Sequence, residues 1–151
     1  MNEAEFWGRR IRPLIAARGM AERVENGLGS GTPDVFYCIN GVGGWIENKY
    51  RERPPMRDTT VVFPSPAGKG PGLRKEQIAW WMQYAKHGGV GAIVAGVGSD
   101  TWWFKPSPEL LRAFNHLTWA QFNSCARWHL VDRAGENLLA QLRGGTRCVV
   151  K

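Results

Sequence analysis

The stretch SGTPDVFYCINGVGGWIENKY, residues 30–50, contains two segments rich in β-branched and aromatic residues on either side of an Asn-Gly pair. Such composition is typical of strands, so we expect strands at residues 34–39 and 45–50. Asn40 and Gly41 tolerate the positive φ angles of a two-residue hairpin turn. The sequence therefore predicts an antiparallel hairpin that turns at this pair.

The turn sets which residues face each other across the hairpin. If Ile39 faces Val42, the pairing continues residue by residue until Asp34 lies directly opposite Glu47. Side chains alternate along a strand, so Lys49 points to the same face of the sheet as Glu47. The register thus predicts two carboxylates and one ammonium group on a single face.

This cluster predicts a metal site. Two carboxylates opposed in antiparallel strands have Cβ atoms about 5 Å apart and destabilise the sheet unless a cation lies between them. Mg²⁺ prefers oxygen ligands and completes its shell with water and substrate phosphate, so we expect Mg²⁺ at Asp34 and Glu47, with Mn²⁺ able to replace it. Two alternatives remain open: a bulge at Gly43-Gly44 would shift the register by one residue, and the charged residues could be a solvated polar face.

The segments around the hairpin complete an αβββαβ order. The first helix is expected to begin after Asn2, a plausible N-cap, and to end at Gly19. Apolar spacing, β-branched content and breakers then predict a strand at 59–63, a loop at 64–72, a helix at 73–87 and a strand at 90–97.

The rest of the chain favours helices. N-cap patterns occur at Ser107 and Thr118, and a further helical segment is expected at 132–142. No long polar linker separates these helices from the preceding elements. We therefore expect a single domain, made of a core at 1–98 and a mainly helical extension at 99–151 that packs on it.

Composition narrows the partner and the compartment. With 20 Lys and Arg against 13 Asp and Glu, the 151-residue chain has a formal net charge of +7, which favours a polyanionic partner. Three irregularly spaced cysteines argue against a disulfide framework and fit a reducing interior. No apolar run approaches the ~18 residues of a membrane span. We expect a cytoplasmic protein of a prokaryotic or virus-infected cell, without a membrane partner.

At the hairpin the chain resembles the PD-(D/E)xK nuclease superfamily. Within it, the chain is most similar to the virus-type replication and repair nuclease (VRR-NUC) group and less closely similar to archaeal Holliday-junction resolvases. The resemblance covers roughly residues 3–98 and rests on four segments: GSGTPDVF, GWIENK, LRKEQIAWW and GGVGAIVAGV. Trp81 departs from the Gln-x-x-x-Tyr pattern of some exonuclease branches.

The resemblance implies a restriction-endonuclease-like α/β fold with an αβββαβ core, in which a mixed sheet is flanked by helices. It also implies a metal bound by Asp34, Glu47 and the main-chain carbonyl of Asn48. Lys49 would then assist the attacking water. This agrees with the chemistry of phosphodiester hydrolysis, which needs an activated water and neutralisation of charge on the transition state.

Two further residues receive roles from the resemblance alone. Glu5 would be the acidic residue of the first helix in the catalytic site, and Gln77 would be the polar residue of the later helix. Each has an ordinary structural alternative. Glu5 has the position of a capping-box carboxylate, and Gln77 could be a helix surface residue.

Basic side chains flank these elements and could follow a phosphate backbone. Arg74 and Lys75 stand in the first turn of a predicted helix, where positive charge opposes the helix dipole unless an anion lies nearby. The residues expected to contact DNA are Arg23, Ser30, Arg51, Lys69, Arg74 and Lys75.

The sequence therefore predicts a Mg²⁺-dependent DNA endonuclease, with structure-specific action on branched DNA in repair or recombination. Symmetric cutting of a four-way junction further predicts a homodimer, for which Trp119, Phe122 or Trp128 would supply the interface. Two alternatives stay open. One is a sequence-specific restriction-type endonuclease, and the other is a non-catalytic DNA-binding protein.

Overall fold

The predicted hairpin is present in the computed structural model. Strand β2 (Val35–Ile39) pairs antiparallel with strand β3 (Val42–Arg51), and the last pair of the ladder is Val35 with Ile46. The two turn residues have positive φ angles of 52° and 80°, as a two-residue turn of this kind requires. The pairing runs through both glycines of β3 without a bulge, so the predicted register is confirmed. The structure describes residues 1–24, 31–129, 131–132 and 135–144, and for 125–129 only the backbone.

The hairpin belongs to a mixed five-stranded sheet of order β1-β2-β3-β4-β5. Strands β1 (Gly19–Arg23) and β5 (Asp100–Phe104) pair antiparallel with β2 and β4, whereas β4 (Gly91–Val97) pairs parallel with β3. Every residue of β4 is buried, as is typical of a strand of small and β-branched residues covered on both faces. The predicted class, a mixed sheet flanked by helices, is confirmed.

The identity of the third strand differs from the prediction. Residues 59–63 form no strand, because Val61 makes only an isolated bridge with Thr118 and its neighbour Val62 donates to the Leu117 carbonyl. The strand that completes the αβββαβ order is β1, which begins at Gly19, the residue at which the first helix is predicted to end. This edge strand forms on the free side of β2, although its own sequence, GMAER, has little β propensity.

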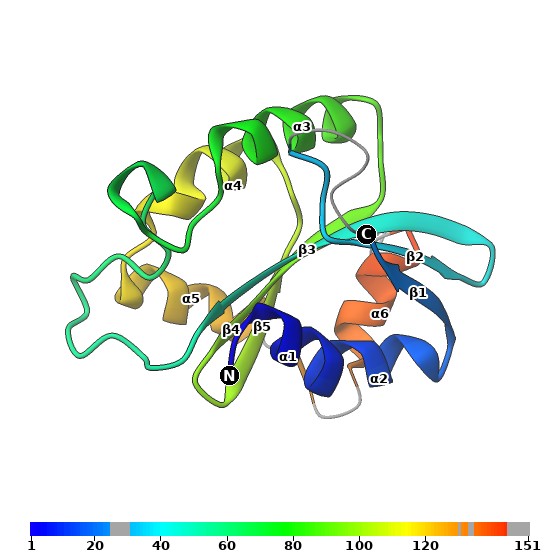
Figure 1. Ribbon diagram of the computed structural model, residues 1–151, viewed down its shortest axis with the longest axis horizontal. Coiled ribbons are helices and arrows are strands. Elements are labelled where there is room, and N and C mark those ends of the chain that lie inside the picture. Colours follow the sequence, from blue (N-terminus) through cyan, green and yellow to red (C-terminus); the bar gives the residue numbers. More distant parts are fainter. Residues whose placement is uncertain (25–30, 130, 133–134, 145–151) are drawn as a thin grey trace, which may run out of the picture.

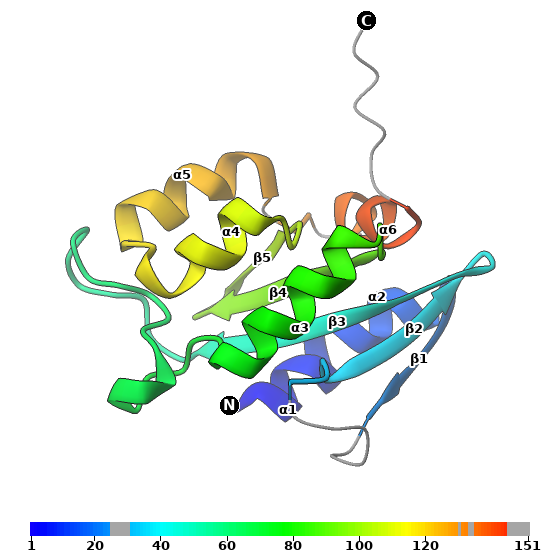
Figure 2. The ribbon, with the colours of Figure 1, turned by 90° about the horizontal axis from the view of Figure 1, so that it is seen from above.

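Helices cover both faces of the sheet (Figure 1). One face carries a continuous N-terminal helical run and the last helix: α1 (Glu3–Phe6), the π-helical segment η1 (Trp7–Ile11), α2 (Arg12–Ala16) and α6 (Glu136–Leu142). The other face carries α3 (Lys75–Lys86), α4 (Pro108–Ala113) and α5 (Trp119–His129), together with the short 3₁₀ segments η2 (Pro66–Gly68) and η3 (Phe114–His116). Figure 2 shows α3 running across β3 and β4. Within the described ranges, none of the helices is both long and apolar enough to cross a membrane.

Each face of the sheet has its own hydrophobic core. On the α3 side, Trp81 of α3 and Ile93 of β4 share a buried cluster with Phe63, Phe114 and Phe122. Phe114 stacks on Phe63 with ring centroids 5.5 Å apart. The extension therefore closes the core on this side of the sheet.

One of the three residues predicted for a dimer interface, Phe122, does not fit this packing. Phe122 has 0% exposure and lies against Trp102, Phe104 and Phe63 within its own chain. Trp119 is half-buried and stacks on Phe122. Because an enclosed side chain cannot also contact a second copy of the chain, the prediction that Phe122 contributes to a dimer interface is wrong. The side chain of Trp128 lies outside the described residues.

Phe122 is expected to stabilise the single chain. Phe122→Ala should lower the free energy of unfolding by about 3–5 kcal/mol, because it removes a buried ring and leaves a cavity. Urea denaturation measures this loss, and sedimentation should show the same assembly for the variant and the wild type.

Met56→Ala is the matched control, since Met56 is an apolar side chain with 100% exposure. It should change stability by no more than about 0.5 kcal/mol. A Phe122→Ala variant of wild-type stability that has lost a dimer would contradict the core assignment.

Candidate active site

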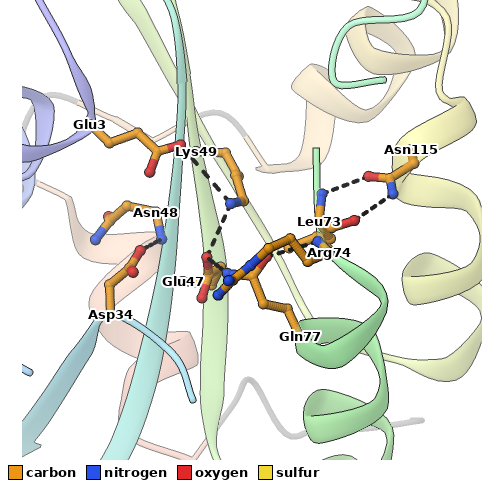
Figure 3. Close-up of polar contacts among 9 residues, drawn as sticks. All are labelled: Glu3, Asp34, Glu47, Asn48, Lys49, Leu73, Arg74, Gln77 and Asn115. Carbon is orange, nitrogen blue, oxygen red and sulfur yellow. Dashed lines mark hydrogen bonds and ion pairs between the residues drawn. The ribbon is translucent and has the colours of Figure 1, made fainter. Parts of the chain in front are cut away.

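The predicted pair of carboxylates meets at the open end of the hairpin. Asp34 immediately precedes β2, one step beyond the last pair of the ladder, and Glu47 is the β3 residue that this register places opposite. The Asp34 Oδ2 atom accepts a hydrogen bond of 3.1 Å from the main-chain N–H of Asn48 (Figure 3). This bond ties Asp34 to β3 and holds its carboxylate beside the site.

Glu47 is the centre of the site. Its carboxylate has 0% exposure, and its Oε1 atom lies 3.2 Å from Lys49 Nζ and accepts a 2.6 Å hydrogen bond from Gln77 Nε2. Burial raises the pKa of Glu47 to about 8; the charge of Lys49 opposes this rise and that of Asp34 adds to it. In the metal-free protein a carboxylate at this position is therefore costly to ionise.

The amide of Gln77 comes from α3 on the same face of the sheet. Gln77 is 4% exposed and stands one turn before Trp81, which is fully buried against the sheet. Its Oε1 atom accepts a 2.9 Å hydrogen bond from the main-chain N–H of Arg74, while its Nε2 atom donates to Glu47. Both ends of the amide are thus used, so the structure brings Gln77 into the predicted site rather than onto the helix surface.

The acidic residue that the first helix contributes is Glu3. Its Oε1 atom lies 4.0 Å from Lys49 Nζ; burial raises the pKa of Glu3, Lys49 opposes the rise and Asp34 adds to it. Glu5 instead accepts a hydrogen bond from the Asn2 main chain and pairs with Arg9 and the N-terminal amine. The structure therefore gives Glu5 the capping role that sequence analysis left open and does not bring it beside Lys49. The capping pattern itself is the signal that favoured this outcome.

The oxygen atoms of the site suit a divalent cation. Glu47 Oε2 is buried and accepts no hydrogen bond from the described residues, which is costly for a polar atom unless another group binds it. In the described ranges, no group of three or more His, Cys, Asp or Glu side chains is arranged so that it could hold a metal ion by itself. Mg²⁺ does not need one, because it commonly uses one or two carboxylates with water and phosphate. The residues present therefore fit Mg²⁺.

The residues predicted to contact DNA divide into two sets. Lys69, Arg74 and Lys75 are exposed around the start of α3, and Arg23 is exposed on the edge strand β1. Arg51 is used internally, since its guanidinium donates to the main-chain carbonyls of Arg53, Val61 and Val62. It holds the segment after β3 and is not a free phosphate ligand. Ser30 lies outside the described residues.

This chain has limited similarity to known proteins. No family model matches this chain, and no curated protein matches it. Among solved structures, the chain is similar to Hjc, a Holliday junction resolvase from the archaeal hyperthermophile Archaeoglobus fulgidus, with a TM-score of 0.46 and 17% sequence identity. The similarity covers 68% of this chain and 76% of that chain. Membership of the virus-type replication and repair nuclease group stays a prediction.

The raised pKa of Glu47 predicts a pH-dependent stability in EDTA. Between its usual value of 4.5 and about 8, the folded protein holds a proton on Glu47 that the unfolded chain has released. Stability is therefore lost as pH rises through this window, by up to about 1.4 kcal/mol per pH unit. Glu47→Gln removes this titration. Urea denaturation should therefore show the free energy of unfolding of the variant rising relative to that of the wild type from about pH 5 to about pH 8.

Glu52→Gln provides the control, because the Glu52 side chain is 71% exposed. Its stability relative to the wild type should not change over the same pH range. A constant difference between Glu47→Gln and the wild type at all pH values would show that Glu47 ionises normally in the folded protein.

Proposed function

We propose that this chain is a metal-dependent endonuclease that hydrolyses phosphodiester bonds in DNA. The observation that carries the proposal is Glu47, a fully buried carboxylate that lies 3.2 Å from Lys49 Nζ and has one oxygen atom that accepts no hydrogen bond from the described residues. Asp34 reaches the same place from the neighbouring strand. Burying these charged groups does not stabilise the fold, because removing them from water is costly.

Mg²⁺ is the proposed cofactor, with Mn²⁺ as a substitute. Asp34, Glu47 and the main-chain carbonyl of Asn48 would hold the ion. When bound, Mg²⁺ supplies a water activated at neutral pH and neutralises negative charge on the phosphoryl oxygens.

The remaining residues of the site have roles that follow from their contacts. Glu47 and Glu3 hold the ammonium group of Lys49 in the site. At this place it would orient the attacking water or stabilise a phosphate oxygen. Gln77 donates to Glu47 and so fixes the orientation of that carboxylate. A preorganised arrangement of this kind reduces the reorganisation needed during the reaction.

DNA is the proposed substrate because the chain is basic and the exposed cations lie near the site. Arg74 and Lys75 stand at the start of the helix that also carries Gln77. We propose branched DNA, such as four-way junctions or flaps, as the preferred class of substrate. This follows the resemblance of the Pro33-Asp34 and Glu47-x-Lys49 motifs to those of the PD-(D/E)xK nuclease superfamily. Paired cuts in a junction need two sites, so we further propose a homodimer.

The carboxylates are tested by Asp34→Asn, which keeps an acceptor for the Asn48 N–H but removes a charge. Cleavage of labelled four-way junctions in Mg²⁺ should fall at least roughly 100-fold, because a direct metal ligand is weakened. Binding of the same junction in EDTA should be unchanged or tighter, since less negative charge faces the phosphates.

Asp58→Asn removes a charge at an exposed position and should cleave as the wild type does. Linear, flapped and single-stranded substrates complete the panel. Cutting of linear duplex at a fixed sequence would favour a restriction-type enzyme. If the wild type binds DNA but does not cut it in Mg²⁺ or Mn²⁺, the protein is a non-catalytic DNA-binding protein.

The exposed cations at α3 are tested by the salt dependence of binding. Arg74→Ala combined with Lys75→Ala should flatten the slope of log affinity against log salt by about 1.8, if each residue neutralises one phosphate. Fluorescence anisotropy with a labelled junction in EDTA measures the slope without cleavage.

Arg9→Ala combined with Arg12→Ala is the matched control, because it removes the same charge from the helices on the other face of the sheet. Its slope should stay close to that of the wild type. An equal effect of both pairs would mean that the phosphate contacts are not centred on α3.

A further inference from the structure

Asn115, in the 3₁₀ segment η3, binds the main chain of Leu73 on both sides. Its Oδ1 atom accepts from the Leu73 N–H and its Nδ2 atom donates to the Leu73 carbonyl, each at 2.7 Å (Figure 3). Only one orientation of the amide satisfies both partners, so the side chain is fixed. The two residues are 42 positions apart in sequence. The bonds therefore connect the extension to the chain just before α3.

The surroundings make this connection rigid. Phe114, the neighbour of Asn115, has 0% exposure and stacks on Phe63 in the core. Gly72 precedes Leu73, and a Cβ atom at this position would lie 2.3 Å from Asn115 Oδ1 and 2.4 Å from the Phe63 carbonyl oxygen. Only glycine allows so close an approach. The main chain at Leu73 is thus held at a defined place.

One peptide bond and two hydrogen bonds lead from Leu73 to Glu47. Leu73 is followed by Arg74, whose main-chain N–H donates to Gln77 Oε1 at 2.9 Å. Gln77 Nε2 in turn donates to Glu47 Oε1 at 2.6 Å, and the same oxygen lies 3.2 Å from Lys49 Nζ. The position of the Arg74 N–H therefore sets where the Gln77 amide can meet Glu47.

We propose that Asn115 is a positioning residue of the active site, which fixes the start of α3 so that Gln77 orients the Glu47 carboxylate. The reaction it serves is the proposed phosphodiester hydrolysis, and for that part the inference rests on the proposed function. Within the part of the chain that the structure describes, the Asn115 side chain forms its hydrogen bonds with Leu73 and not with Glu47 or Gln77. It acts on Glu47 through Arg74 and Gln77.

The first test uses the metal-free protein and needs no activity. In the NMR spectrum of the wild type, the Gln77 side-chain amide protons should be shifted by the bond to Glu47 and should exchange slowly. Asn115→Ala should move these signals toward those of a free amide and speed their exchange. Asn115→Asp, which keeps the acceptor for the Leu73 N–H but loses the donor, should show a smaller change of the same kind.

Ser107→Ala is the matched control. It removes the N-cap bond that the Leu110 N–H donates to Ser107 Oγ in α4, the helix that leads into η3, and leaves the Leu73 contacts in place. The Gln77 signals should stay at their wild-type positions. If they move as much in Ser107→Ala as in Asn115→Ala, or in neither, the inference is overturned.

The second test is a double-mutant cycle on cleavage, at a temperature where all variants are folded. Asn115→Ala should lower kcat about 10-fold with little change in KM, because the reacting groups are misplaced while DNA contacts remain. In a Gln77→Ala background the same change should have no further effect on kcat. An additive loss would mean that Asn115 does not act through Gln77.

The two proposals fail in different ways. A wild type that cuts no DNA in Mg²⁺ or Mn²⁺ would overturn the nuclease function, while the Gln77 signals would still report whether Asn115 positions that residue. If the wild type cuts DNA but the Gln77 signals do not change in Asn115→Ala, only the positioning role is overturned.

Discussion

A buried carboxylate is costly, and the surroundings of Glu47 can be understood as compensation for that cost. Glu47 lies on β3 between β2 and β4, where water does not reach it. Lys49 supplies an opposite charge and Gln77 supplies a donor, yet the pKa of Glu47 is still raised to about 8. One carboxylate oxygen has no partner within the described residues. The protein therefore maintains a destabilising group at a defined place, which is characteristic of functional sites.

The extension after β4 contributes to the site as well as to the core. Phe114 and Phe122 complete the hydrophobic cluster beneath α3, and Asn115 binds the main chain that leads into that helix. Neighbouring residues of the extension thus complete the core and bind the chain that leads into α3. A minimal αβββαβ core would lack these two rings and the bonds to Leu73, so the extension also holds the start of the helix that carries Gln77.

The sequence was most informative where structure depends on neighbouring residues. Asn40-Gly41 determines the turn, the turn determines the register, and the register brings Asp34 beside Glu47. Prediction was wrong for residues 59–63, where Val62 and Phe63 enter a core while the main chain bonds to Thr118 and Leu117. Strand β1 was missed because its pairing comes from the free edge of β2 and not from its own composition.

For the site, the sequence by itself determined the Asp34, Glu47 and Lys49 cluster, since all three lie on one hairpin with a two-residue period. Only the tertiary structure decided the contributions from distant elements. It placed Glu3 rather than Glu5 beside Lys49, bound Arg51 to carbonyls within its own chain, and enclosed Phe122. It also set Asn115 against Leu73. These contacts join residues far apart in the chain, and the packing angles that create them leave no local pattern in the sequence.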